Sequence, residues 1–162
     1  MPGGAVQTFA GNAFEIDLNE DWRFYPDPEE PGFLYFQNQR VDAGLACDSM
    51  VTEPHDRDLD DFGLNFIEAY VGGMGKAAAM EGAPEPPKIH SINQLQVETG
   101  REWIVSGFSA GRGQWFAWIV VRNFMYFTMR MESLTMLEAQ LAFLFNQVRR
   151  NVFLAELKAT IA

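Results

Sequence analysis

Cysteine and histidine are scarce in this sequence, which excludes several kinds of site. Cys47 is the only cysteine among 162 residues, so no intramolecular disulfide can form and nothing indicates an oxidising compartment. Cys47 also lies in an alternating stretch, which is typical of a small buried hydrophobe rather than a nucleophile. His55 and His90 are the only histidines and no Cys-x-x-Cys pair is present, so a zinc site lacks its usual ligands.

Long apolar runs are also missing. The longest apolar stretch covers residues 115–121, which is far too short to cross a bilayer. The first residues lack the basic region and the long apolar region of a signal peptide. We therefore expect a cytoplasmic protein without membrane insertion.

Basic residues are few in the first part of the chain. Residues 15–61 contain 14 acidic and 3 basic residues, whereas residues 62–162 contain 8 acidic and 9 basic residues. The net charge of -10 therefore belongs to the first part. The electrostatic field of such a negative region repels nucleic acid and anionic membranes, and it steers basic protein surfaces toward the chain. The sequence thus favours a protein partner and no nucleic acid.

The composition is that of one globular domain. Apolar residues make up 48% of the chain and aromatic residues 14%, and this length is enough to bury a core. Residues 1–12 are small and glycine-rich, and we expect them to form a flexible N-terminal arm. Residues 13–162 are expected to form the single domain.

Local patterns in the first half predict three strands and a helix. The strands are expected at residues 14–18, 33–37 and 43–51. A proline-rich acidic loop lies between the first two of them. Asp58 is placed to cap a helix that begins at residue 59.

That helix is expected to fray at Gly72, Gly73 and Gly75, because glycine is a poor helix former. Residues 81–88 follow it and are typical of an extended, polyproline-like linker.

The second half predicts an antiparallel meander and a closing helix. Its strands are expected at residues 89–97, 102–108, 114–121 and 124–132. Thr135 and Glu138 have the spacing of a capping box, which predicts a helix over 137–157.

The predicted order of elements is βββαββββα. The strand at 114–121 is apolar on both faces, so both faces need cover. We therefore predict an α+β fold: an α/β/α-type sandwich with a mainly antiparallel sheet of about six or seven strands and two main helices.

Three features carry a resemblance to a known fold. The first is the opening strand FEIDL, with Trp22 four residues after Leu18. The second is a helix between an early hairpin and a four-strand meander, and the third is an amphipathic helix after FMYFTMRMES. This pattern resembles the PsbP-like fold, which the Ran-binding Mog family and the DcrB-like family share. The latter includes the Eag chaperones, which hold type VI secretion effectors. The resemblance implies a protein that binds other macromolecules.

A calcium motif fails at its diagnostic positions. Asp56, Asp58 and Asp60 have the spacing of EF-hand ligands. Asp61 stands where that loop needs glycine, and Ile67 stands where it needs glutamate. The sequence assigns no catalytic residue, no metal ligand and no cofactor.

Two groups of residues are candidates for binding a partner. An acidic and aromatic group interleaves acidic and aromatic residues on a proline-stiffened loop, which suits a basic, partly apolar surface. Its members are Trp22, Tyr25, Asp27, Glu29, Glu30, Asp56, Asp58, Asp60 and Asp61. A second group would occupy an uncovered sheet face, although core beneath the first helix is the alternative for it. Its members are Trp115, Phe116, Trp118 and Tyr126.

Three functional hypotheses remain open. The first is a non-enzymatic chaperone or adaptor for a secreted effector with apolar helices. The second is an acidic immunity protein that neutralises a basic toxin, and the third is a small-ligand binder or an enzyme. A homodimer is a further hypothesis for the partner.

Overall fold

A computed structural model describes residues 5–82 and 85–155 of the chain. Its elements, in chain order, are β1 (Gln7–Ala10), β2 (Phe14–Leu18), β3 (Trp22–Phe24), β4 (Leu34–Asn38), β5 (Gly44–Val51), α1 (Leu59–Met80), β6 (Lys88–Leu95), β7 (Arg101–Ser109), β8 (Gly113–Val121), β9 (Met125–Ser133), α2 (Glu138–Arg149) and β10 (Val152–Leu154). Neither helix within the described residues is long and apolar enough to cross a membrane.

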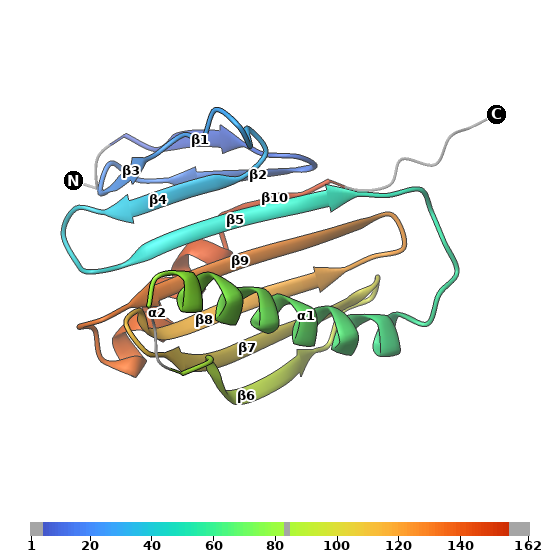
Figure 1. The fold of residues 1–162 in the computed structure, drawn as a ribbon. Helices are drawn as coiled ribbons and strands as arrows, with labels where there is room; N and C mark the ends of the chain where they lie inside the picture. The colour runs from blue at the N-terminus through green and yellow to red at the C-terminus, as the bar shows by residue number, and fades with distance from the viewer. Residues whose placement is uncertain (1–4, 83–84, 156–162) are drawn as a thin grey trace.

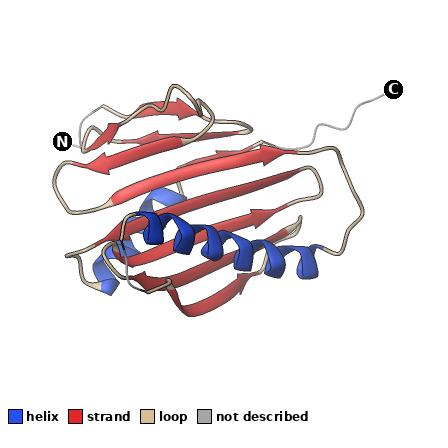
Figure 2. Cartoon of the chain, in the orientation of Figure 1, coloured by secondary structure: helices blue, strands red, loops and turns tan. Residues whose placement is uncertain are grey.

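The architecture is a layered α+β sandwich, as predicted. Seven antiparallel strands form the large sheet in the order β3-β4-β5-β9-β8-β7-β6, and three form a small sheet in the order β1-β2-β10. Helix α1 lies across the front of the large sheet and α2 lies behind it (Figures 1 and 2). The helices thus cover opposite faces of the large sheet. This cover is what β8 needs, because its residues are apolar on both faces.

Two hydrophobic cores result from this layering. The larger core lies behind the large sheet, where α2 and β2 pack on alternate residues of β9. Phe127 and Phe145 are fully buried there, and the ring of Phe14 meets Phe127 with the centroids 5.0 Å apart. The smaller core lies under α1, where Trp103 and Trp115 are buried. Alternation along the strands sends neighbouring side chains into different cores.

The small sheet corrects part of the predicted N-terminal arm. Residues 7–10 form β1 and pair with β2 from Gln7↔Leu18 to Ala10↔Glu15. Phe9 explains this ordering, because its ring packs on Phe36 with centroids 4.9 Å apart. The first four residues of the predicted arm lie outside the described residues.

Helix α1 is longer than predicted. It continues through the three glycines to Met80, because Met74 and Ala78 anchor its far half on the sheet. No atom lies within 4 Å of the position that a Cβ would take on Gly72 or Gly73, so these glycines face solvent. Residues 83–84 of the predicted linker lie outside the described residues.

Helix α2 is shorter than predicted and ends at Arg149. The chain then turns and adds β10 to the free edge of β2, which pairs that edge and packs Val152 and Leu154 against the larger core. The predicted capping box is also wrong. The hydroxyl of Thr135 donates to Asp42 instead, and the N–H of Leu137 donates to Gln140 at 3.3 Å. The end of the predicted range, beyond residue 155, lies outside the described residues.

Candidate functional site

The two ends of the large sheet differ in chemistry. Strand register places Val51 opposite Met125 at one end, and Gly44 opposite Glu132 toward the other. The first end carries residues 26–33, which lead into β4, and residues 52–61, which lead into α1 at the right of Figure 1; we call it the acidic end. The opposite end carries the β4–β5 turn and the β9–α2 connection, which are residues 39–43 and 134–137. Together with the first half of α2 they form the apolar end.

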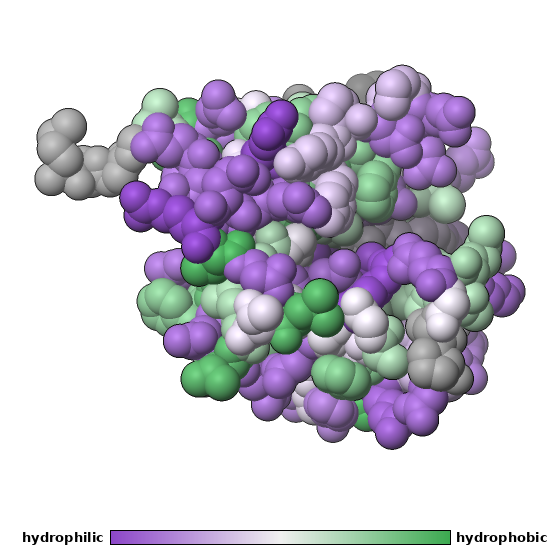
Figure 3. All heavy atoms as spheres, turned by 60° about the vertical axis from the view of Figure 1, so that its left-hand side comes forward, coloured by the Kyte–Doolittle hydropathy of each residue, from purple (hydrophilic) through white to green (hydrophobic). Residues whose placement is uncertain are grey.

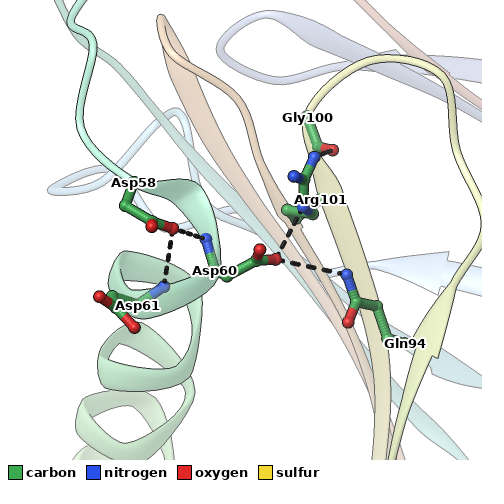
Figure 4. A network of polar contacts seen from close by, with 6 residues as sticks. All are labelled: Asp58, Asp60, Asp61, Gln94, Gly100 and Arg101. Carbon is green, nitrogen blue, oxygen red and sulfur yellow. Dashed lines mark hydrogen bonds and ion pairs between the residues drawn. The ribbon is translucent and has the colours of Figure 1, made fainter.

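The start of α1 uses two of the predicted acidic residues for its own structure. The carboxylate of Asp58 accepts hydrogen bonds from the backbone N–H groups of Asp60 at 2.9 Å and Asp61 at 3.4 Å, which confirms it as the N-cap. Asp60 forms an ion pair with Arg101 at 2.7 Å and accepts a hydrogen bond from Gln94 at 3.5 Å (Figure 4). These contacts fasten the helix to β6 and β7, so Asp58 and Asp60 serve the fold.

The loop between β3 and β4 carries a separate acidic group. The N–H of Glu29 donates to the carboxylate of Asp27 at 3.0 Å, which stabilises the turn. Burial raises the pKa of Asp48 on β5, and the negative charge of Glu30 raises it further. All seven predicted acidic residues are exposed, and they form two groups at the acidic end rather than one.

The two aromatic members of that prediction have different places. Trp22 is only 5% exposed and belongs to the larger core, so it is not a surface anchor as predicted. The burial of Trp22 was not predicted, because it results from the pairing of β3 with β4, which the proline-rich sequence did not indicate. Tyr25 is exposed, and the guanidinium of Arg23 lies 5.3 Å from its ring centroid.

The predicted sheet-face group is divided between two covered faces. Trp115 and Tyr126 lie under α1, and the ring of Tyr126 stacks on Phe62 with centroids 4.9 Å apart. Phe116 and Trp118 lie on the α2 side. The structure therefore does not bring these four together as an open surface, because each face received its own helix.

Trp118 shows how fully this region is enclosed. Its indole N–H donates to the carboxylate of Glu102 at 2.8 Å, and the guanidinium of Arg149 lies 5.4 Å from its ring. Cys47 is likewise enclosed in the core, and burial raises the pKa of its thiol. Among the described residues, no cluster of three or more potential ligands could hold a metal ion.

An apolar groove at the apolar end was missed by the sequence reasoning. It has a volume of about 500 Å³. Its lining residues are Val41, Met136, Ala139, Gln140, Phe143 and Leu144. Phe143 is 67% exposed, and the neighbouring Leu137 and Leu134 are 68% and 64% exposed. Figure 3 brings the left-hand side of Figure 1 forward and shows hydrophobic residues among polar ones on this side.

The groove follows from how α2 docks. Leu141, Phe145 and Val148 are buried, so Phe143, two positions from the first two, must point away from the core. Phe143 is an apolar residue that falls outside the helical spacing of the buried residues, and this could have indicated an exposed apolar side chain from the sequence alone. Opposite α2, Val41 reaches the groove from the β4–β5 turn, which only the tertiary structure brings there.

Comparison with solved structures identifies the fold. A solution structure of cyanobacterial PsbP (CyanoP) from Synechocystis matches with a TM-score of 0.70 at 13% identity, over 92% of this chain and 92% of that chain. A crystal structure from Bacteroides thetaiotaomicron matches with a TM-score of 0.52 at 14% identity, over 97% of this chain and 50% of that one. The Ran-binding protein Mog1p from Saccharomyces cerevisiae matches with a TM-score of 0.47 at 12% identity, over 94% of this chain and 97% of that one.

The architecture is thus an α+β sandwich of a known type, and the type is the PsbP-like fold, as predicted. No family model matches the chain, and no curated protein matches it in sequence. Since the identities are near 13%, the likeness establishes only the fold, and the function has to be inferred from this chain's own residues.

Proposed function

We propose that this protein is a non-enzymatic protein that binds another protein through the groove on α2. The observation that carries the proposal is the exposure of Leu137 and Phe143 around a groove whose only polar lining residue is Gln140. Large apolar side chains that gather on a surface usually mark an interaction site. Aromatic residues such as Phe143 are also frequent anchors in interfaces.

The shape of the groove favours an apolar helix as its occupant. Ala139 and Phe143 are four residues apart on α2, as are Gln140 and Leu144, so they form two adjacent rows along the helix. A second helix packs against such rows with its own apolar stripe, which is a common mode of peptide recognition. Covering one large apolar side chain contributes about 1.5–3 kcal/mol.

At a finer level, we propose a chaperone or adaptor role toward a secreted effector. The groove would hold an apolar helix of the effector and keep it from water before export. The PsbP-like fold and the groove support this role, and the groove now takes the place of the sheet face that the sequence had offered for it.

The test uses capture followed by titration. Tagged protein captures partners from its native cell at low and high salt, and mass spectrometry identifies the dominant one. The purified partner is then titrated against Phe143→Glu and a matched control, Leu64→Glu, on the exposed side of α1 where Leu64 is 52% exposed. We expect Phe143→Glu to weaken binding by about thirtyfold and the control to leave it unchanged. Unchanged affinity in a folded Phe143→Glu protein would contradict the proposal.

The acidic end favours a second candidate, an immunity protein that neutralises a basic toxin. Asp27, Glu29 and Glu30 are exposed on one loop, and such charge speeds the encounter with a basic surface. For this candidate, a triple variant with Asn or Gln at these positions should bind less tightly, and affinity should fall steeply with salt. Affinity that is equal at low and high salt would eliminate it.

A further inference from the structure

The strand β6 forms one edge of the large sheet and remains unusually unprotected. It is the last strand in the sheet order and eight residues long, whereas β3 at the opposite edge has three. Within the described residues, no strand pairs with the outer side of β6, which lies at the lower border of Figure 1. A long open edge presents backbone donors and acceptors to any other strand.

The usual protections of an edge strand are weak in β6. Lys88 is its only charged residue, and the strand contains no proline. Ile89 and Ile92 are 42% and 44% exposed. The one irregularity in the pairing with β7 lies between Ile89 and Ser91, so the rest of the strand, through Leu95, keeps a regular register. This part can therefore accept a further strand.

We propose that a second copy of this chain pairs antiparallel with β6 across a two-fold axis. Such an interface is self-complementary, because each copy offers the same open row of hydrogen-bonding groups. Ile92 lies opposite Val105 on the α1 side of the sheet, so the Ile92 side chains of the two copies come close beside the axis. The pairing joins two large sheets into one continuous sheet.

The distribution of charge favours a second copy in this orientation. The carboxylate of Asp60 lies at the far end of β6, where it contacts Gln94, and it is 53% exposed. Lys88 is paired with Glu85 at 3.9 Å and Asp60 with Arg101 at 2.7 Å. Antiparallel pairing therefore places a balanced ion pair of each copy beside one of the other, so no unbalanced like charges meet at either end. The residues between carry no charge, so no like charges face each other across the axis.

Sedimentation velocity over a range of protein concentrations tests the proposal. The wild-type chain should dimerise reversibly, and Ile92→Lys should weaken the dimer by about tenfold or more, because two lysines then face each other near the axis. The matched control is Phe153→Lys, at a residue 55% exposed on the short edge strand β10, and it should leave the dimer unchanged. Hydrogen exchange of β6 amides should slow as concentration rises.

Several outcomes would overturn the proposal. A wild-type chain that stays monomeric up to its solubility limit has no such interface, and its edge is then free for an extended peptide. A dimer that Ile92→Lys leaves intact uses another surface, and loss of that dimer in Phe143→Glu would place it at the α2 groove. If Ile92→Lys does not fold, Asn93→Lys puts the charge on the other face of the same edge, and it should weaken the dimer equally.

Discussion

The acidic end and the apolar end are held by different means. At the acidic end, most of the charge sits on exposed side chains that need little support from the rest of the fold, because water stabilises them. At the apolar end, the connection between β9 and α2, which carries the exposed Leu134 and Leu137, is fastened by a carboxylate, that of Asp42. Its Oδ2 accepts hydrogen bonds from the N–H groups of Leu134 at 2.8 Å and Thr135 at 3.1 Å. Exposed charged side chains thus need few supporting contacts, whereas the exposed apolar surface depends on the hydrogen bonds that hold the connection between β9 and α2.

Removing that carboxylate should have the largest effect. Asp42→Ala leaves the N–H of Leu134 without its acceptor and the N–H of Thr135 with only the hydroxyl of Ser133 at 3.2 Å, and it should lower the free energy of unfolding by about 2 kcal/mol. Urea denaturation measures the change. Asp27→Ala, at an exposed turn of the acidic end, is the control and should lower stability less. Equal losses in the two variants would erase the contrast between the ends.

The helix cap at the acidic end should have the next largest effect. Asp58→Ala removes the acceptor for two N–H groups of α1 and should cost about 1 kcal/mol. Asp61→Ala loses only the interaction of its charge with the helix dipole, so its loss of stability should be smaller. Thermal unfolding of both variants provides the measurement, and a greater loss in Asp61→Ala would show that Asp58 is not the cap.

The ion pair between Asp60 and Arg101 should contribute less again. The two side chains are 53% and 40% exposed, so solvent screens their attraction. A double-mutant cycle with alanine at both positions should give a coupling of about 0.5 kcal/mol that disappears at high salt. A coupling that persists at high salt would mean that this part of the acidic end is more than a solvated surface.

Substitution of Asp48 should change the free energy of unfolding least, and it should raise it rather than lower it. Burial, and then Glu30, raise its pKa in the folded state above that of the unfolded chain. Stability is therefore lost as the pH rises from the ordinary aspartate pKa through the raised value. Asp48→Asn should slightly stabilise the protein at neutral pH and give no gain below the ordinary aspartate range. A gain that is equal at both pH values would exclude ionisation as its cause.

Elements with strong local signals could be predicted from the sequence. The alternation in β2 and the Asp58 cap of α1 are local patterns, and both are present in the structure. Strands β1 and β10 were not predicted, because each is short and is ordered by its pairing with β2. For β10, this partner is also far away in the sequence. The acidic residues were correctly expected at the surface. Trp22 was not correctly placed, since its burial depends on the packing of several strands.

Composition and periodicity act over a few neighbouring residues. They were therefore enough to predict where charge accumulates, the antiparallel meander, and the two helices with their apolar stripes. Three features became visible only in the folded chain: Trp115 and Trp118 are enclosed on opposite faces, Phe143 and Val41 meet at one groove, and β6 is left open at an edge. These outcomes depend on which distant elements cover one another, and long-range packing is not encoded in any local pattern.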